Sequence, residues 1–108
     1  MMINKFYNML GLASRARKIV TGETLITKIR ANEVNLVIIA SDASDNSQKK
    51  ICDKCTFYNV EYIIEGSIDE LSKAIGKSNR VAVGIMDIGF AKKLKEKIGG
   101  WYYGKTNK

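Results

Sequence analysis

The spacing of apolar residues along the chain predicts helices that alternate with short buried strands. Near the start of the chain, apolar side chains recur every three or four positions, which is the period of an amphipathic helix over about residues 3–14. Two uninterrupted apolar runs, residues 36–40 and 81–86, are typical of strands that are buried on both faces of a sheet. Ile19-Val20 and the segment 60–64 predict two further short strands, because both are rich in β-branched residues.

Four more helices are predicted between and after these strands. The second helix ends near Asn32, the fourth reaches about Ile75, and Gly99-Gly100 stops the last one. The positions at helical spacing are Ile3, Phe6, Tyr7, Leu10 and Ala13 in the first helix, Leu25, Ile26 and Ile29 in the second, Ile51, Cys52, Cys55 and Tyr58 in the third, and Ile88, Ala91, Leu94, Lys95 and Ile98 in the last.

Polar residues at the predicted helix starts can accept the backbone N–H groups that a helix leaves unpaired. We expect the Thr21 hydroxyl to cap the second helix, the Ser/Asp segment 41–44 to cap the third, and Asp87 to cap the last. Ser67 and Glu70 match the capping box that begins the fourth helix.

This alternation predicts an α/β fold, namely a three-layer α/β/α sandwich. We expect a small mixed sheet of about four strands covered by about five helices. The chain shows no internal repeat and no Pro or Gly/Ser linker, so residues 1–99 are expected to form a single domain, with residues 100–108 as a short tail.

The charge balance favours a polyanionic partner. The chain has 18 Lys and Arg against 11 Asp and Glu, a net charge of +7, and the excess is not confined to one tail. Nucleic acid is the first expectation and an anionic membrane surface the second. No apolar run approaches the ~18 residues that span a membrane, and the N-terminus lacks the apolar core of a signal peptide. With two cysteines and no disulfide-like framework, we expect a reducing compartment, the cytoplasm.

The residues needed for common catalytic and metal sites are absent. The chain has no His, which excludes His-dependent triads and proton shuttles. Cys52 and Cys55 supply only two thiols, and they fall well inside a helix, so we interpret them as core thiols and not as a zinc or redox site. Asp42 and Asp87 each follow a buried strand, where helix capping explains them better than acid catalysis. We therefore expect no catalytic residue, no metal and no cofactor.

Two basic turns remain as candidate chemistry. Arg15, Arg17 and Lys18 precede the second helix, whose first N–H groups and dipole attract anions, and Gly22 would let a phosphate approach the backbone. The second turn, residues 77–80, precedes a central strand. If both turns lie at the same edge of the sandwich, they would bind two segments of RNA backbone.

Several short motifs, in their order and spacing, resemble those of the bacterial YlxQ-type proteins, which belong to the kink-turn-binding ribosomal protein family. The resemblance covers about residues 3–98. The motifs are Leu10-Gly11-Leu12-Ala13, Arg15-Ala16, Lys18, Gly22-Glu23, the segment 36–44, Glu70-Leu71 and the segment 74–77.

The resemblance implies an α/β/α sandwich that binds kink-turn RNA, a sharply bent internal loop with sheared G·A pairs, without catalysis. The polar pair that reaches those G·A pairs in the family falls on Glu23 and Thr24 here. The family's supporting lysine aligns with Thr27, and Lys28 lies ~100° further around the helix. A loop that covers flipped-out bases in the family is here the basic segment 77–80, from which we expect phosphate contacts.

The predicted partner is therefore structured RNA, either a kink-turn or ribosomal RNA, bound by a monomer, with the ribosome as a further candidate partner. Two alternatives stay open: an accessory domain of RNA-modifying machinery, and a protein-interaction module that uses the aromatic tail Trp101-Tyr102-Tyr103. The candidate RNA-binding residues are Arg15, Arg17, Lys18, Thr21, Gly22, Glu23, Thr24, Thr27, Lys28, Ile75, Gly76, Lys77, Ser78, Asn79 and Arg80.

Overall fold

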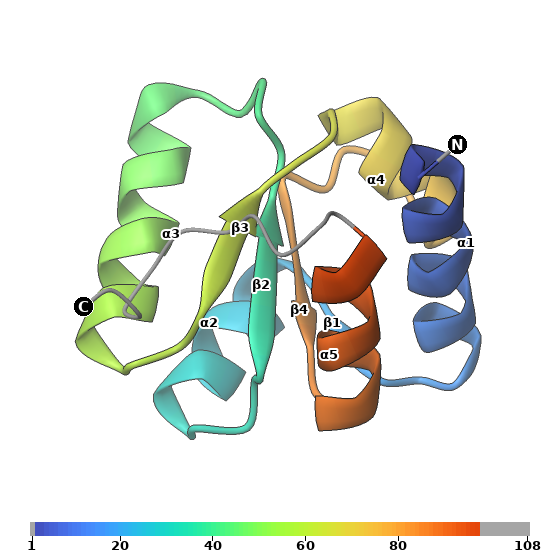
Figure 1. Cartoon of the computed structure of the whole chain (residues 1–108). Coiled ribbons are helices and arrows are strands. Elements are labelled where there is room, and N and C mark those ends of the chain that lie inside the picture. Colours follow the sequence, from blue (N-terminus) through green and yellow to red (C-terminus); the bar gives the residue numbers. More distant parts are fainter. Residues whose placement is uncertain (1, 98–108) are drawn as a thin grey trace.

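Five helices and four strands make up the part of the chain that the computed structural model describes, residues 2–97 (Figure 1). In chain order they are α1 (Met2–Arg15), β1 (Ile19–Val20), α2 (Gly22–Arg30), β2 (Leu36–Ile39), α3 (Asp45–Phe57), β3 (Tyr62–Ile64), α4 (Ile68–Ala74), β4 (Ala82–Ile85) and α5 (Ile88–Lys97). The predicted alternation is confirmed. The predictions for Ile98, Gly99, Gly100 and the tail from Trp101 lie outside the described residues, as does the side chain of Ile3.

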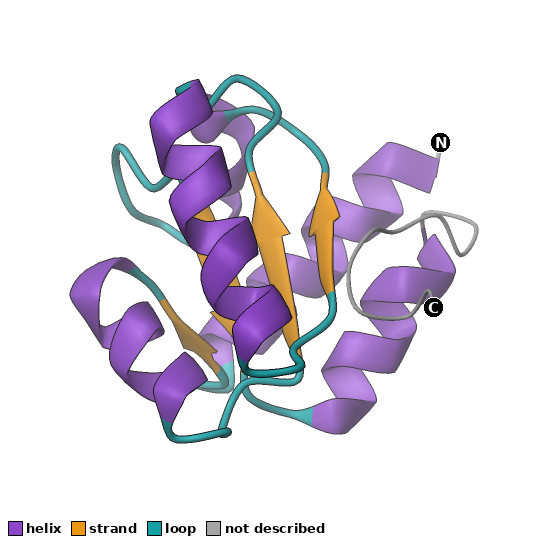
Figure 2. Cartoon of the chain, turned by 90° about the vertical axis from the view of Figure 1, so that its left-hand side faces the viewer, coloured by secondary structure: helices purple, strands orange, loops and turns teal. Residues whose placement is uncertain are grey.

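The four strands form one mixed sheet in the order β1-β4-β2-β3. β4 runs antiparallel to both of its neighbours, β1 and β2, whereas β2 and β3 are parallel. The sheet is covered on one face by α1, α4 and α5 and on the other by α2 and α3 (Figure 1). Figure 2, seen from the side of α2 and α3, shows these two helices in front of the strands. The predicted three-layer sandwich is confirmed.

Alternate side chains of the central strand β2 pack into two separate cores, one on each face of the sheet. Leu36 and Ile38 pack with Phe6 and Leu10 of α1 in the core beneath α1, α4 and α5. Val37 and Ile39 point the other way, into the core beneath α2 and α3. Because both faces of the strand are buried, its sequence is continuously apolar and does not alternate with polar residues.

Three of the four predicted caps are present. Ser44 accepts a hydrogen bond from Ser47 N at 3.1 Å at the start of α3, and Asp87 accepts one from Phe90 N at 2.9 Å at the start of α5. At the start of α4 the Ser67 hydroxyl accepts one from the third residue of the helix. These bonds pair N–H groups that helix geometry leaves without a partner.

Asp42 is a cap, but it caps a helix distant in sequence. Its carboxylate accepts a hydrogen bond from the backbone N–H of Ile68 at 2.9 Å, at the first residue of α4. Ile88, which falls at the helical spacing of α5, is 67% exposed, so the buried face of this helix begins at Ala91.

Gly84 lets α2 lie close to the sheet. This residue is in β4 and pairs with Val20 on one side and Val37 on the other. A Cβ atom at this position would overlap a methyl group of Leu25 and would lie 3.0 Å from Val20 Cγ2. The missing side chain therefore allows Leu25, one turn into α2, to sit directly against the strand, and this contact fixes the height of the start of α2 above the sheet.

Candidate nucleic-acid interface

The Arg80 side chain joins the second basic turn to the start of α2. Arg80 Nε donates a hydrogen bond to the hydroxyl oxygen of Thr21 at 3.2 Å, although the two residues are 59 positions apart. Arg80 is itself held in place, because its Nη1 donates to the Ser78 carbonyl and its backbone N–H donates to Ser72 Oγ, each at 2.8 Å. The second basic turn therefore lies at the same edge of the fold as the start of α2.

The predicted capping role of Thr21 is wrong. Thr21 does occupy the N-cap position of α2 in an extended conformation, but its hydroxyl accepts no hydrogen bond from the helix. The hydroxyl instead accepts the Arg80 hydrogen bond. The first N–H groups of α2 have no acceptor within the helix and remain suited to an anion.

Gly22, the first residue of α2, has a positive φ of 63°, which glycine adopts without strain. Within residues 2–97, no heavy atom other than those of its chain neighbours and its own helix backbone lies within 4 Å of the position where its Cβ would be. The backbone at the start of α2 is therefore open to close approach by a ligand.

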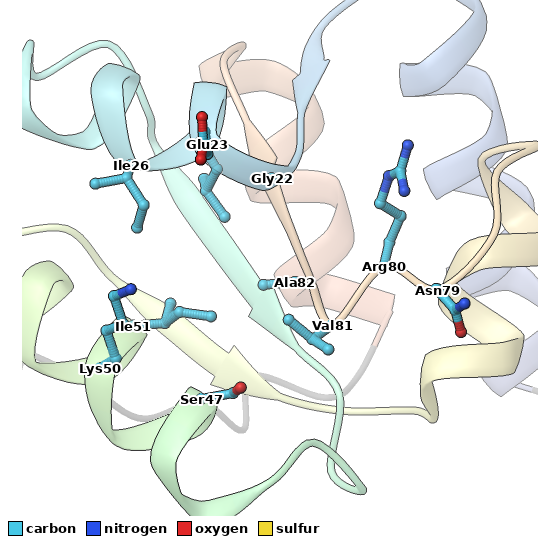
Figure 3. A pocket seen from close by; sticks show the side chains of 11 residues that line it. Gly22, Glu23, Ile26, Ser47, Lys50, Ile51, Asn79, Arg80, Val81 and Ala82 are labelled. Atoms are coloured by element: carbon cyan, nitrogen blue, oxygen red, sulfur yellow. The ribbon is translucent and has the colours of Figure 1, made fainter.

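Beside the Arg80–Thr21 hydrogen bond lies an open cleft of about 330 Å³ between α2, α3 and the segment that leads into β4 (Figure 3). Buried side chains of Leu25, Ile51 and Ala82 form its floor, and its rim is polar. The lining residues are Gly22, Glu23, Leu25, Ile26, Ser47, Lys50, Ile51, Asn79, Arg80, Val81 and Ala82. An apolar floor within a charged rim can hold an unpaired base while the rim contacts its phosphates.

Four of the predicted residues around α2 and the second turn line this cleft, and others are exposed beside them in the sequence. Gly22, Glu23, Asn79 and Arg80 line it. Thr24 is exposed in the first turn of α2. Gly76, which has a φ of 72°, Lys77 and Ser78 are exposed in the second turn, but they do not line the cleft.

The first basic cluster is not brought to the cleft. Arg15, Arg17 and Lys18 are exposed, but none of them lines it. The Lys18 carbonyl accepts a hydrogen bond from Met86, just beyond the carboxyl end of β4, whereas Arg80 lies before its amino end. Arg15 borders a different groove, between α1 and α4.

Three other predicted residues already have partners in the fold. Lys28 forms an ion pair with Glu33 at 2.9 Å, and the Thr27 hydroxyl donates to the Glu23 carbonyl at 3.2 Å. Ile75 is only 6% exposed and belongs to the core, which corrects the expectation that its side chain lies at the interface. Its position in the sequence, directly before the exposed turn, had suggested a surface residue.

Ser47 and Lys50 of α3 are cleft residues that the sequence reasoning missed. Nothing local marks them, because α3 reaches the cleft only through its packing beside α2.

The two cysteines lie on α3, away from the cleft lining. Cys55 is fully buried, and burial raises the pKa of its thiol to about 12. Burial also raises the pKa of Cys52, which is only partly buried, so the prediction of two core thiols holds fully for Cys55 alone. Within residues 2–97, no three metal-ligating side chains cluster, and no helix has the length and apolar character to cross a membrane.

Comparison with known sequences gives a consistent family. The model of the ribosomal protein L7Ae/L30e/S12e/Gadd45 family matches residues 4–95. The chain is 47% identical over 91 residues to RNA-binding protein YlxQ of Bacillus subtilis (strain 168), which covers 83% of this chain and 91% of that protein. RNA-binding protein YlxQ of Enterococcus faecium is 46% identical over 97 residues, covering 89% and 93%.

Solved structures show the same architecture. A protein with unknown function from Bacillus halodurans C superposes with a TM-score of 0.83 at 41% identity, over 88% of this chain and 97% of that one. The Giardia lamblia 15.5kD RNA binding protein superposes with a TM-score of 0.72 over 91% and 85% of the two chains. At 21% identity, this second likeness concerns the fold alone.

Proposed function

This chain belongs to the ribosomal protein L7Ae/L30e/S12e/Gadd45 family, and on that premise we propose that it is a non-catalytic RNA-binding protein that recognises structured, kink-turn-like RNA. The observation that carries the proposal is the hydrogen bond from Arg80 to Thr21, which holds two turns distant in sequence around one open cleft. In this proposal the protein acts as a monomer in the cytoplasm, on ribosomal or other structured RNA.

Electrostatics at the cleft supports a phosphate ligand. The start of α2 carries about half a positive charge from the helix dipole, and Gly22 leaves its backbone open. Lys50 and Arg80 lie on the cleft rim, and Lys77 is exposed in the adjoining turn. Since Lys28 is paired with Glu33, we assign phosphate contacts to Lys50 and Lys77 in its place.

Recognition of the bent RNA is assigned to Glu23 and Thr24. Both side chains are exposed at the start of α2, and Glu23 also lines the cleft. A carboxylate accepts hydrogen bonds from base amino groups, and a hydroxyl can both donate and accept. We propose that Glu23 and Thr24 contact the sheared G·A pairs, while the lysines around them bind the phosphates of the RNA backbone.

A gel-shift comparison at several salt concentrations tests the proposal. One RNA is a kink-turn, and the other is identical except that Watson–Crick pairs replace its sheared G·A pairs. We expect the kink-turn to bind about tenfold or more tightly, because each specific base contact is worth about 1–3 kcal/mol. With about 4 to 6 phosphate contacts, the slope of log K against log salt should be about −3 to −5. Equal binding of the two RNAs would exclude kink-turn recognition.

Two variants separate backbone binding from recognition. Lys77→Ala should weaken both RNAs alike and flatten the salt slope by about 1. Thr24→Ala should mainly reduce the difference in affinity between the two RNAs. Lys93→Ala is the matched control, since it removes an exposed lysine from α5 on the opposite face of the sheet. A loss of affinity with Lys93→Ala as large as with Lys77→Ala would show that total charge, and not the cleft, governs binding.

A further inference from the structure

The outer face of α3 carries an exposed aromatic ring in line with two lysines. Lys50, Lys54 and Phe57 are spaced four and three residues apart, which places them on one side of a helix. Phe57 is 80% exposed, more than any other large hydrophobic side chain whose placement the structure describes. The core does not explain this side chain.

The lysines beside Phe57 are available for a ligand. Their neighbour Lys49 is paired with Asp53 at 3.3 Å. Lys50 and Lys54 form no ion pair with any of residues 2–97. This side of α3 therefore presents two positive charges that nothing in the described fold neutralises.

The RNA cleft and the Phe57 face form one continuous surface. Lys50 lines the cleft between α2 and α3, and it also lines a second, shallow hollow of about 520 Å³. The rest of that hollow is lined by Asp53, Lys54, Phe57 and Tyr58. A strand leaving the cleft past Lys50 would reach the aromatic ring without crossing another element.

The ring is suitably held for stacking. Phe57 and Tyr58 pack edge to face, with ring centroids 4.9 Å apart and an angle of 77° between planes, which supports the Phe57 ring while most of it remains open to solvent. An exposed aromatic face with cations beside it is the arrangement on which proteins stack unpaired bases. Lys50 and Lys54 are separated by about 6 Å of helix rise, comparable to the spacing of successive phosphates along a strand.

We propose that α3 extends the RNA-binding surface: Phe57 stacks on an unpaired nucleotide of RNA held in the cleft, while Lys50 and Lys54 bind the adjoining phosphates. This inference rests on the proposed function of the cleft. A protein partner is less suited to the face, because one ring among charged and polar side chains lacks the apolar centre of a protein interface.

The test compares a blunt-ended kink-turn RNA with the same RNA carrying a short single-stranded extension on one stem or the other. We expect one of the two extensions to raise affinity about tenfold, the lower range of stacking one base on an aromatic side chain. Phe57→Ala should remove this gain and leave the affinity for the blunt RNA unchanged, whereas Phe57→Trp should retain the gain. Lys54→Ala should flatten the salt slope by about 0.7 for the extended RNA only.

Ile88→Ala provides the matched control, because Ile88 is also an exposed apolar side chain, 67% exposed, on α5. It should leave both affinities unchanged. A photoreactive base in the extension should crosslink to the α3 peptide that contains Phe57. The proposal is overturned if neither extension raises affinity, if the gain survives Phe57→Ala, or if the crosslink maps elsewhere. If neither extension raises affinity, Phe57 would be assigned to contact with a protein partner instead of RNA. The comparison of kink-turn and Watson–Crick RNAs reports separately on the cleft.

Discussion

Replacing Gly84 by Ala tests whether the packing beneath α2 sets the geometry of the cleft. The new methyl group would overlap a methyl of Leu25 and would lie 3.0 Å from Val20 Cγ2 and 3.3 Å from Val34 Cγ1. The strand cannot easily move away, because β4 is hydrogen-bonded to β1 and β2 on its two sides. Either the Leu25 side chain must leave its position, or α2 must lift from the sheet.

The expected loss of stability follows from two opposing terms. Overpacking a well-filled core costs about 1–3 kcal/mol. The reduced freedom of the unfolded chain returns about 0.4–1 kcal/mol when Gly becomes Ala. We expect a net loss of about 1–2 kcal/mol, which in a domain of this size lowers the melting temperature by about 5–10 °C.

A double-mutant cycle identifies the clash as the cause. Leu25→Ala alone should cost about 2–5 kcal/mol, because it empties part of the core. In the double variant the methyl group introduced by Gly84→Ala occupies some of that space. The double variant should therefore lose at least about 1 kcal/mol less unfolding free energy than the sum of the losses of the two single variants. Urea unfolding followed by circular dichroism measures all four proteins.

RNA affinity provides the second measurement for Gly84→Ala. If α2 lifts, the start of the helix moves relative to Arg80, and binding of the kink-turn RNA should weaken even though the variant alters no cleft residue. Unchanged or increased stability of Gly84→Ala, or strictly additive losses in the cycle, would refute the packing argument.

Three further predictions concern other contacts. Ser72→Ala removes the buried hydroxyl that accepts the partly buried N–H of Arg80, so we expect a loss of about 1 kcal/mol in unfolding experiments and faster hydrogen exchange of that amide. Unchanged exchange would contradict this role. Asp42→Ala removes the acceptor for Ile68 N–H and should cost about 1 kcal/mol by thermal unfolding, whereas a neutral result would show that the cap is dispensable. Because burial raises the pKa of the Cys55 thiol from 9.0 to about 12, this thiol ionises at lower pH in the unfolded chain than in the folded protein. The free energy of unfolding should therefore be level below pH 9 and should fall toward pH 12, less steeply in Cys55→Ala. An equal fall with pH in both proteins would argue against this thiol as the cause.

Most of the fold could be predicted because the relevant signals are local. The continuous apolar run of residues 36–40 required a strand with two buried faces, and β2 divides its side chains between two cores. The caps at Ser44, Ser67 and Asp87 depend on groups three residues away, so the sequence was sufficient to place them. Asp42 was correctly predicted to cap a helix, but only the packed structure directs it to α4.

The candidate site could be predicted only in part. Gly22, Glu23 and the turn around Arg80 were found from charge, turn residues and family resemblance, and they do meet at one cleft. The cations at Arg15 to Lys18 form a dense basic cluster directly before α2 in the sequence, yet they lie toward the other end of β4. Charge density along the chain therefore indicated the class of partner but not the position of the interface.

The sequence by itself determined which segments become helices and strands, since hydrophobic period and capping act over a few residues. The tertiary structure decided which of those segments meet. Because β4 lies between β1 and β2, the turn that precedes it reaches the start of α2, and Arg80 can bond to Thr21 across 59 positions. The same packing brings Lys50 of α3 to the cleft and requires Gly84 beneath Leu25. Strand order is a property of the whole chain, and no local pattern specifies it.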